Sequence, residues 1–385
     1  MSPHARLALL AALVTACASS PRNTRGARAR SHSARSDHGA SGRRLRGCPS
    51  RVGSGFEGAR PDRVESVVFD VGHVCARLHD GSVRCLGENT HGELGAAHRG
   101  EVVREPVTVV GLGRSAEVSV GRRITCARHR GGTVRCIGSA ESGQLGTGSE
   151  ITPDEQGALV PVQGVSGATQ ISTSLGTTCA RVSDGTLRCW GREGDSVATP
   201  VRDIRGLVEF DLEGLFHGCG RFEEGSVRCG RFARSVSVSG ATQLDAGSTH
   251  ACARLDDGTV RCWGFNSSGQ LGTDAPTPDA YTPVDPGVRC VTQVAVGGDH
   301  TCALVTDGTV RCWGGNHFGQ LGDGTMSDRA TAAPVAGVSN VVRLFAGGGT
   351  TCAVDDEGEL SCWGQSLWLP GRLPSTLLRP TEVRW

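Results

Sequence analysis

Two cysteines ten residues apart recur seven times in this 385-residue chain, and no other feature limits the possible fold as strongly. The clearest copy reads HTCALVTDGTVRCWG from His300 and is followed by a Gly-Gln-Leu-Gly element that ends at Gly322. The seven pairs are Cys75 and Cys85, Cys126 and Cys136, Cys179 and Cys189, Cys219 and Cys229, Cys252 and Cys262, Cys302 and Cys312, and Cys352 and Cys362. Their first members lie 51, 53, 40, 33, 50 and 50 residues apart, and periods of this size are typical of repeat folds.

Each copy is predicted to form a β-hairpin, because apolar and β-branched residues flank a turn that ends in glycine. In the sixth copy a three-residue loop, Thr306–Gly308, pairs Val305 with Thr309 and so places Cys302 opposite Cys312. Gly308 then occupies a left-handed position in which a side chain would be strained. Directly opposed residues lie within disulfide distance. The spacing therefore predicts one disulfide bond in every hairpin.

The N-terminus has the features of an export signal. The apolar run Leu7–Val14 is too short to span a bilayer as a helix, but it has the length of a signal-peptide core. The run leads into Val-Thr-Ala-Cys17, which resembles the lipobox of bacterial lipoproteins. This resemblance implies that residues 1–16 are a signal peptide and that Cys17 is acylated. The alternative is an ordinary cleaved signal with an incidental cysteine.

Residues 17–47 are rich in Arg, Ser and Gly and poor in bulky apolar residues. Such a segment cannot offset its ordering entropy by burial, so we expect a flexible, disordered tether. Its arginines raise the question of nucleic-acid binding. In an exported chain, a solvated linker attracted to anionic lipid or acidic polysaccharide is the better interpretation, and no nucleic-acid partner is expected.

Reduced cysteines and metal sites are the alternatives to disulfide bonds. Zinc ligands usually occur in closely spaced Cys-x-x-Cys pairs, which the sequence lacks, and matched pairs in an exported chain favour oxidation. Two further cysteines, Cys48 and Cys290, are available to pair with each other. Their disulfide would tie the end of the tether to the folded body.

The recurring pattern His-x-Cys-Ala-Leu, Asp-Gly-x-Val-x-Cys-Trp-Gly and Asn-x-x-Gly-Gln-Leu-Gly resembles the repeat of the regulator of chromosome condensation family. It is most similar to the secreted, cysteine-bearing bacterial branch, and the resemblance extends from about Arg63 to Trp385. It implies an all-β fold over residues 48–385, a seven-bladed β-propeller of four-stranded antiparallel blades. A repeat of 33–53 residues has room for four strands of about five residues with their turns, which agrees.

The copies differ outside the hairpins. Copies 3 and 4 lack the Gly-Gln-Leu-Gly element after Gly191 and Gly230, and long connectors follow copy 2 and copy 5. Connectors on a rigid scaffold often carry specificity, although neutral drift explains them equally well.

Repeat position also explains the candidate chemical residues. The histidines that lie two residues before a first cysteine are expected to make a structural hydrogen bond within each blade, and the tryptophans that follow a second cysteine are expected to pack the blades. These residues are His73, His217, His250 and His300, and Trp190, Trp263, Trp313 and Trp363. The sequence has no Gly-x-Ser-x-Gly elbow and no lysine for a phosphate-binding loop. We therefore assign no catalytic, metal-binding or cofactor-binding residue.

These observations predict a non-enzymatic cell-envelope lipoprotein whose disulfide-bonded propeller binds a protein or a glycan. We expect a monomer without a cofactor, held by its lipid at the outer membrane or cell surface. One alternative is an inhibitor of a secreted enzyme, by analogy with a propeller-type β-lactamase inhibitor of the same family. Guanine-nucleotide exchange, the activity of the family's nuclear namesake, fits poorly because an exported chain would not meet a cytosolic GTPase.

Overall fold

The computed structural model describes residues 47–49, 62–95, 97, 99–148, 157–192, 195–212, 218–230, 232, 234–275, 281–370 and 373–385. These residues belong to one compact unit, Arg44–Trp385. The predicted signal peptide, the acylation site Cys17 and the tether before Gly47 lie outside the described residues.

Within these ranges the chain forms 27 strands, which are grouped here into seven consecutive blades. Blade 1 contains β1 (Val64–Phe69), β2 (His73–Leu78), β3 (Val83–Glu88) and β4 (Val102–Thr108); blade 2 contains β5 (Ser115–Gly121), β6 (Ile124–His129), β7 (Val134–Gly138) and β8 (Val160–Pro161). Blade 3 contains β9 (Ala168–Ser174), β10 (Thr177–Val182), β11 (Leu187–Gly191) and β12 (Thr199–Pro200); blade 4 contains β13 (Leu207–Asp211), β14 (Cys219–Phe222), β15 (Val227–Cys229) and β16 (Arg234–Val236). Blade 5 contains β17 (Ala241–Ala246), β18 (His250–Leu255) and β19 (Val260–Gly264); blade 6 contains β20 (Val291–Val296), β21 (His300–Val305), β22 (Val310–Gly314) and β23 (Arg329–Pro334). Blade 7 contains β24 (Val341–Gly347), β25 (Thr350–Asp355), β26 (Leu360–Gln365) and β27 (Thr376–Glu382).

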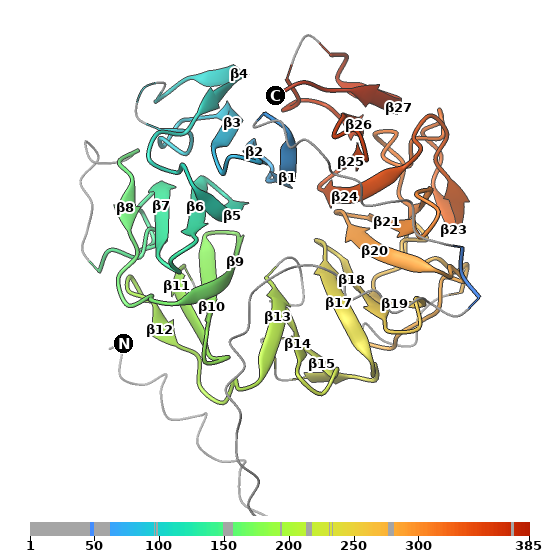
Figure 1. Ribbon diagram of the computed structural model, residues 1–385, viewed down its shortest axis with the longest axis horizontal. Helices are drawn as coiled ribbons and strands as arrows, with labels where there is room; N and C mark the ends of the chain where they lie inside the picture. Colours follow the sequence, from blue (N-terminus) through green and yellow to red (C-terminus); the bar gives the residue numbers. More distant parts are fainter. Residues whose placement is uncertain are drawn as a thin grey trace, which may run out of the picture. The chain divides into compact units, whose positions relative to one another are not determined.

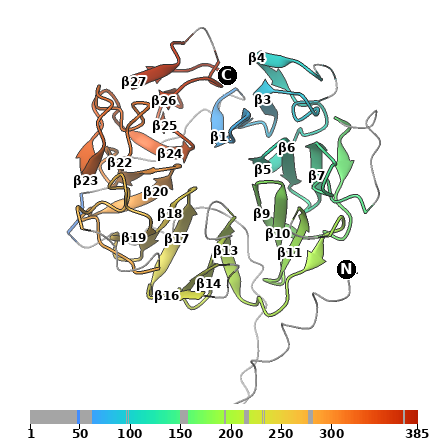
Figure 2. The ribbon, with the colours of Figure 1, turned by 180° about the vertical axis from the view of Figure 1, so that it is seen from behind.

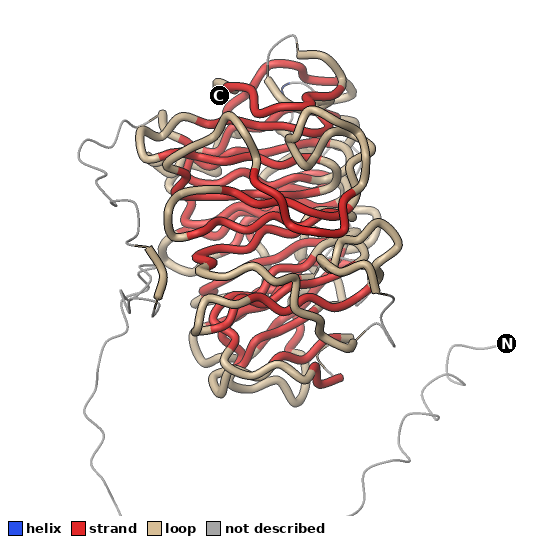
Figure 3. The backbone as a smooth tube through the Cα atoms, turned by 90° about the vertical axis from the view of Figure 1, so that its right-hand side faces the viewer, coloured by secondary structure: helices blue, strands red, loops and turns tan. Residues whose placement is uncertain are grey.

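The seven blades form a ring, with the first strand of each blade nearest the centre (Figures 1 and 2). Every sheet is antiparallel, and its strands follow chain order from the centre outward. In side view the strands run through the thickness of the ring (Figure 3). The prediction of an all-β, seven-bladed propeller is confirmed. The described chain contains no helix that has the length and apolar character of a membrane span.

Blade 5 is the exception to four regular strands. Its outermost position is held by a single bridge, in which Cys262 and Val284 exchange two backbone hydrogen bonds of 3.0 and 2.7 Å. Pro283 and Pro286 flank this bridge. Proline has no N–H to donate to a sheet, so Pro286, two residues beyond Val284, cannot donate the next hydrogen bond of the ladder.

The hairpin register is the one that the cysteine spacing predicts. Cys302 lies opposite Cys312, and the amide of Val305 donates to the carbonyl of Thr309 at 2.9 Å. Gly308 has φ of 79°, the left-handed conformation that favours glycine. The carboxylate of Asp307 accepts hydrogen bonds from the amide and hydroxyl of Thr309, which holds the turn.

Each hairpin contains the disulfide bond between its two cysteines, with Cα atoms 4.0–4.1 Å apart. This short distance is typical of an opposed pair that makes no backbone hydrogen bonds to each other. A further disulfide joins Cys48 to Cys290, whose Cα atoms are 5.5 Å apart. These eight bonds are consistent with an oxidising, extracellular environment.

Side-chain amides join neighbouring inner strands around the centre of the ring. Gln293 in β20 donates to the carbonyl of Leu344 in β24 at 2.6 Å and accepts from its amide at 2.9 Å. Gln243 binds Val294 in the same way, and Gln170 binds Phe210. An amide side chain thus replaces the missing ladder between blades that share no strands.

The ring closes without exchange of strands between the terminal blades. Arg343 of blade 7 donates to the carbonyl of Glu65 in blade 1 at 3.0 Å, and Arg84 of blade 1 donates to the carbonyl of Trp385 at 3.1 Å. Apolar residues of both blades share one buried cluster. Side-chain contacts between blades 7 and 1, together with the C-terminal residue Trp385, therefore close the ring.

Antiparallel order gives the ring two different faces. The Asp-Gly turns between second and third strands lie on one side, which we call the turn face. The tips between first and second strands, together with the loops after third strands, lie on the other side, which we call the loop face. The amide of Thr306, at an Asp-Gly turn, donates to the carbonyl of Cys290 at 3.0 Å, so the Cys48–Cys290 disulfide belongs to the turn face.

Candidate binding face

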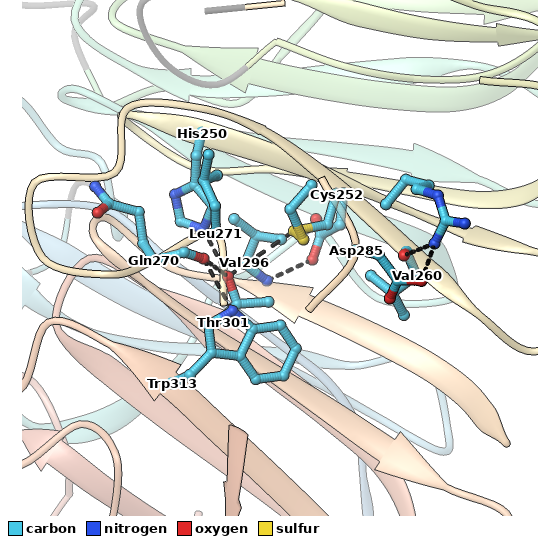
Figure 4. The surroundings of a disulfide bond; sticks show 12 residues. His250, Cys252, Val260, Gln270, Leu271, Asp285, Val296, Thr301 and Trp313 are labelled. Atoms are coloured by element: carbon cyan, nitrogen blue, oxygen red, sulfur yellow. Dashed lines mark hydrogen bonds and ion pairs between the residues drawn. A yellow bond between two sulfur atoms is a disulfide. The ribbon is translucent and has the colours of Figure 1, made fainter. Parts of the chain in front are cut away.

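The histidines that recur at an equivalent position of the repeats link neighbouring blades. His300 Nε2 lies 2.8 Å from the Thr351 hydroxyl of blade 7, and that hydroxyl donates to the Gln320 carbonyl at 3.0 Å. The threonine oxygen must therefore accept from His300 Nε2–H. His250 makes the same contact with Thr301 at 2.7 Å (Figure 4).

The prediction that each histidine forms a hydrogen bond within its own blade was therefore wrong, because the partner lies in the next blade. His73 also contacts the next blade, through Thr125 at 2.9 Å. A side chain on one face of a blade points away from its own strands, so its nearest partner belongs to the adjacent blade. His217 lies outside the described residues.

The tryptophans pack between blades, as their repeat position predicts. Trp313 is fully buried, and its indole N–H donates to the Gln270 carbonyl of the preceding blade at 3.0 Å (Figure 4). A Cβ on Gly272 would lie 3.1 Å from Trp313 Nε1, and Gly272 has φ of 81°. The tryptophan of one blade therefore packs against the Gly-Gln-Leu-Gly element of the preceding blade.

The tips around the centre of the loop face differ strongly from blade to blade. Blades 1–3 carry the large side chains Val71, Arg122, Arg123 and Leu175. The described tips of blades 5–7 carry only small residues, namely Ser248, Thr249, Gly298, Asp299, Gly348 and Gly349. Large side chains at this position are thus confined to one sector among the described tips.

A cleft of about 300 Å³ opens on the loop face beside these tips. Its lining comes from three segments of blade 2 and blade 3: the tip after β5, the loop after β7, and the tip and strand end of blade 3. The lining residues are Arg122, Arg123, Glu141, Ser142, Gln144, Leu175, Gly176 and Arg192. Copy 3 lacks the Gly-Gln-Leu-Gly loop after β11, so no such loop follows Arg192.

The cleft carries an excess of positive charge. Arg123 Nη1 lies 3.7 Å from Glu141 Oε2, and His91 Nε2 lies 3.6 Å from the other oxygen of the same carboxylate. Among the described residues, Arg122 and Arg192 form no ion pair. Glu141 is 57% exposed in its side chain, so its pairing with Arg123 is weak.

Sequence matches place the repeats in a known family. Residues 241–270 and 291–320 match one model of the regulator of chromosome condensation (RCC1) repeat, and residues 257–304 match a second model of it. The matched part of the chain, residues 241–320, is built from RCC1 repeats. Propellers built from RCC1 repeats are generally non-catalytic scaffolds for binding or regulation. The comparison with curated proteins found no match to this sequence.

Solved structures of RCC1-like propellers share this fold. Prp20p of Saccharomyces cerevisiae, whose binding properties to Gsp1p and histones are described, has a TM-score of 0.66 and 19% identity, covering 79% of this chain and 86% of that chain. Human WBSCR16 has a TM-score of 0.51 and 20% identity, with 85% and 83% covered. The ectodomain of the receptor kinase CR4 of Physcomitrella patens has a TM-score of 0.50 and 20% identity, with 81% and 76% covered.

Two buried tryptophans lack the hydrogen bond that Trp313 makes. The side chains of Trp263 in blade 5 and Trp363 in blade 7 are fully buried, and neither indole N–H has a partner among the described residues. Copy 4, which precedes Trp263, lacks the Gly-Gln-Leu-Gly element, whereas copy 6, which precedes Trp363, has it, so the missing element alone does not explain the unpaired N–H. Tyr281 packs against blade 4, with the Arg234 guanidinium 4.0 Å from its ring centroid.

The repeat residues that were singled out from the sequence and that the structure describes belong to the scaffold, and the cleft was missed. The described paired cysteines, histidines and tryptophans of the repeats serve the hairpins and the contacts between blades. Arg122 and Arg123 stand at a tip where copies 5–7 have glycine or small polar residues, and copies 1 and 3 carry Val71 and Leu175 there. This departure from the repeat was the available signal for the cleft, but it appears only when the tips are aligned.

The two tryptophan environments predict different effects of the same substitution. Trp313→Phe removes a hydrogen bond to a buried carbonyl, whereas Trp263→Phe removes a donor that has no described partner. We expect Trp313→Phe to lower the free energy of unfolding by about 1 kcal/mol more than Trp263→Phe. Urea unfolding with the disulfides intact measures the difference, and equal losses for the two variants would contradict the assigned contacts.

Burial keeps the inter-blade histidines uncharged. Desolvation lowers the pKa of His73 to about 4 and the pKa values of His250 and His300 to about 3. The unfolded chain takes up a proton on each histidine as the pH falls below about 6.5, while the folded chain does not until the lower pKa is reached. The stability that these residues provide is therefore complete above pH 6.5 and is lost as the pH falls towards 4.

We expect the free energy of unfolding to decrease between pH 7.5 and pH 5, by about 2 kcal/mol for each buried histidine at pH 5. His300→Gln keeps a side-chain N–H for Thr351 but cannot titrate, so its stability should depend less on pH over this range. The turn carboxylates such as Asp307, whose pKa is lowered by hydrogen bonds from Thr309, titrate below this window. Denaturant titrations at the two pH values test this, and an unchanged pH slope in His300→Gln would refute it.

Proposed function

We propose that the chain is an exported, lipid-anchored RCC1-repeat propeller that catalyses no reaction and binds a protein or a glycan with its loop face. The observation that carries the proposal is the asymmetry of that face. One sector combines a cationic cleft with large exposed side chains on tips that are small in the other described blades. A face that served only the fold would have no need of this difference.

Exposed apolar side chains support the choice of face. Apart from Val102 and Val110, the large hydrophobic residues that are exposed in the described chain lie in the tips and loops of the loop face. They are Val71, Leu175, Phe265, Phe318, Met326 and Leu367. This uneven distribution of exposed apolar side chains favours the loop face as the interaction surface.

The attachment of the tether also favours the loop face. The lipobox-like sequence before Cys17 is the basis for proposing acylation there, with residues 17–47 as the tether. Cys48, which follows that segment directly, is bonded to Cys290 on the turn face. A lipid on Cys17 that is connected through residues 17–47 and Cys48 therefore joins the propeller at its turn face and leaves the loop face free.

A protein is the class of ligand best supported by comparison. The structure of Prp20p is described together with its binding to Gsp1p and histones, and by analogy we propose a protein partner here. Inhibition of a secreted enzyme is a special case of the same proposal, because it requires the same exposed face.

The anchoring part of the proposal predicts a clear effect of Cys17→Ser. In a bacterial host, the wild-type chain should sediment with membranes and carry a diacylated Cys17, because a lipobox cysteine is the acylated residue. Cys17→Ser should lose the lipid and its membrane association. Fractionation and mass analysis of the N-terminal peptide measure both, and an unmodified Cys17 in the exported wild-type chain would remove this part.

The binding part predicts that ligand capture depends on one face. Arg122→Glu with Phe265→Ser changes the loop face, and Arg130→Glu with Val110→Ser is the matched change on the turn face. Captured envelope proteins, secreted hydrolases and glycans should be lost with the first pair and kept with the second, as measured by biolayer interferometry on the oxidised full chain. Loss with the turn-face pair alone would show that the wrong face was chosen.

A further inference from the structure

We propose that the sector of the loop face formed by the tips of blades 1–3 docks an acidic segment of a protein, whose carboxylate enters the cleft between Arg122 and Arg192. This inference rests on the proposed function, since it names the chemistry of the partner for the same face. Val71 and Leu175 would contact apolar residues on either side of that carboxylate.

Charge gives the first argument. Three guanidinium groups line the cleft, and Glu141 is the only carboxylate among the lining residues. Glu141 lies 3.7 Å from Arg123, which leaves Arg122 and Arg192 without an ion pair in the described chain. Arg122 also interacts at longer range with Asp70 of blade 1, whose carboxyl is largely buried. Guanidinium groups bind carboxylates through paired N–H donors, so an anionic side chain is the matching ligand.

Apolar exposure beside the arginines gives the second argument. Val71 is 89% exposed and Leu175 is 61% exposed, and they occupy the tips on the two sides of the Arg122–Arg123 tip. Arginine and apolar side chains together are typical of protein interfaces. The cleft lining contains no aromatic ring, so it offers no stacking platform for a sugar. These features favour a protein over an acidic glycan.

Backbone strain gives the third argument. Leu175 has φ of 48° and Arg123 has φ of 64°, a conformation that is unfavourable for residues with a Cβ. At the corresponding tip of blade 7, Gly348 has φ of 52° and meets this requirement without strain. Leu175 is also exposed, so burial in the core does not explain its presence. A strained residue that the fold does not need indicates a role for its side chain.

The size of the cleft is consistent with one side chain of a larger partner. At about 300 Å³ it lies at the lower end of the range for ligand pockets. A single Asp or Glu fits such a space, while the surrounding tips are available for the rest of the contact.

The test is a selection of random 12-residue peptides displayed on phage, using the oxidised full chain as bait. Peptides that also bind Arg122→Glu with Arg192→Glu are removed by counter-selection. We expect the enriched peptides to share an Asp or Glu flanked by apolar residues. Synthetic copies should bind at least about tenfold more weakly to Arg122→Ala, because a charge-assisted contact is lost.

Leu175→Asn separates binding from folding. Asparagine tolerates the left-handed conformation better than leucine, so this variant should unfold at the same or a higher denaturant concentration and still bind the peptides several-fold more weakly. Arg130→Glu with Arg202→Glu, on exposed arginines of the turn face, is the matched control and should bind like the wild type.

Three outcomes would overturn the inference. Enriched peptides without acidic residues, or peptides whose affinity the cleft variants leave unchanged, exclude the carboxylate site. Binding of alginate or heparin oligosaccharides that Arg122→Ala abolishes, with no peptide enriched, replaces the protein class by an acidic glycan. Each of these results leaves loop-face binding intact, whereas ligand loss only in the turn-face variants would contradict the proposed function itself.

Discussion

The contact between one blade's tryptophan and the preceding blade's Gly-Gln-Leu-Gly element holds the complete part of the ring together. Blades share no strands, so each boundary depends on side chains. At the boundary of blades 5 and 6, the Gln270 carbonyl accepts from both Trp313 and Thr301, and Thr301 in turn accepts from His250. The Gln270 carbonyl thereby connects the buried tryptophan with the histidine contact between the blades and with the disulfide-bonded hairpin. The hairpins supply stable blades, and this contact sets how the blades meet.

Local features of the fold could be predicted from the sequence because they are determined within one repeat. A spacing of ten positions from one cysteine to the next, with a glycine at the turn, allows one hairpin register, in which Cys302 opposes Cys312. The direction of the histidine contact was not predictable in this way. His250 and Thr301 are 51 residues apart, and their contact requires the geometry of two packed blades. The reduced fourth strand of blade 5 also depends on local chemistry, since Pro286 cannot donate the next ladder hydrogen bond, but the repeat pattern concealed it.

The candidate site was harder to predict because it consists of departures from the repeat. A repeat search finds what the copies share, and the shared residues proved to be scaffold. Arg122, Arg123 and Leu175 occupy positions where the other copies tolerate glycine, and Arg192 lies where a loop is missing. Each residue alone is unremarkable in a chain rich in arginine. They form a cleft only because successive blades place their tips side by side on one face.

Rigidity of the scaffold explains how strained tips can persist on this face. A left-handed leucine costs on the order of 1–2 kcal/mol, and the Trp263 donor in blade 5, which has no described partner, adds a cost of similar size elsewhere in the ring. Each disulfide in a loop of about ten residues offsets roughly 3 kcal/mol on the chain-entropy model. Hairpins closed in this way can carry unfavourable tips without opening. The same bonds that indicate an oxidising environment therefore allow the loop face to diverge from blade to blade.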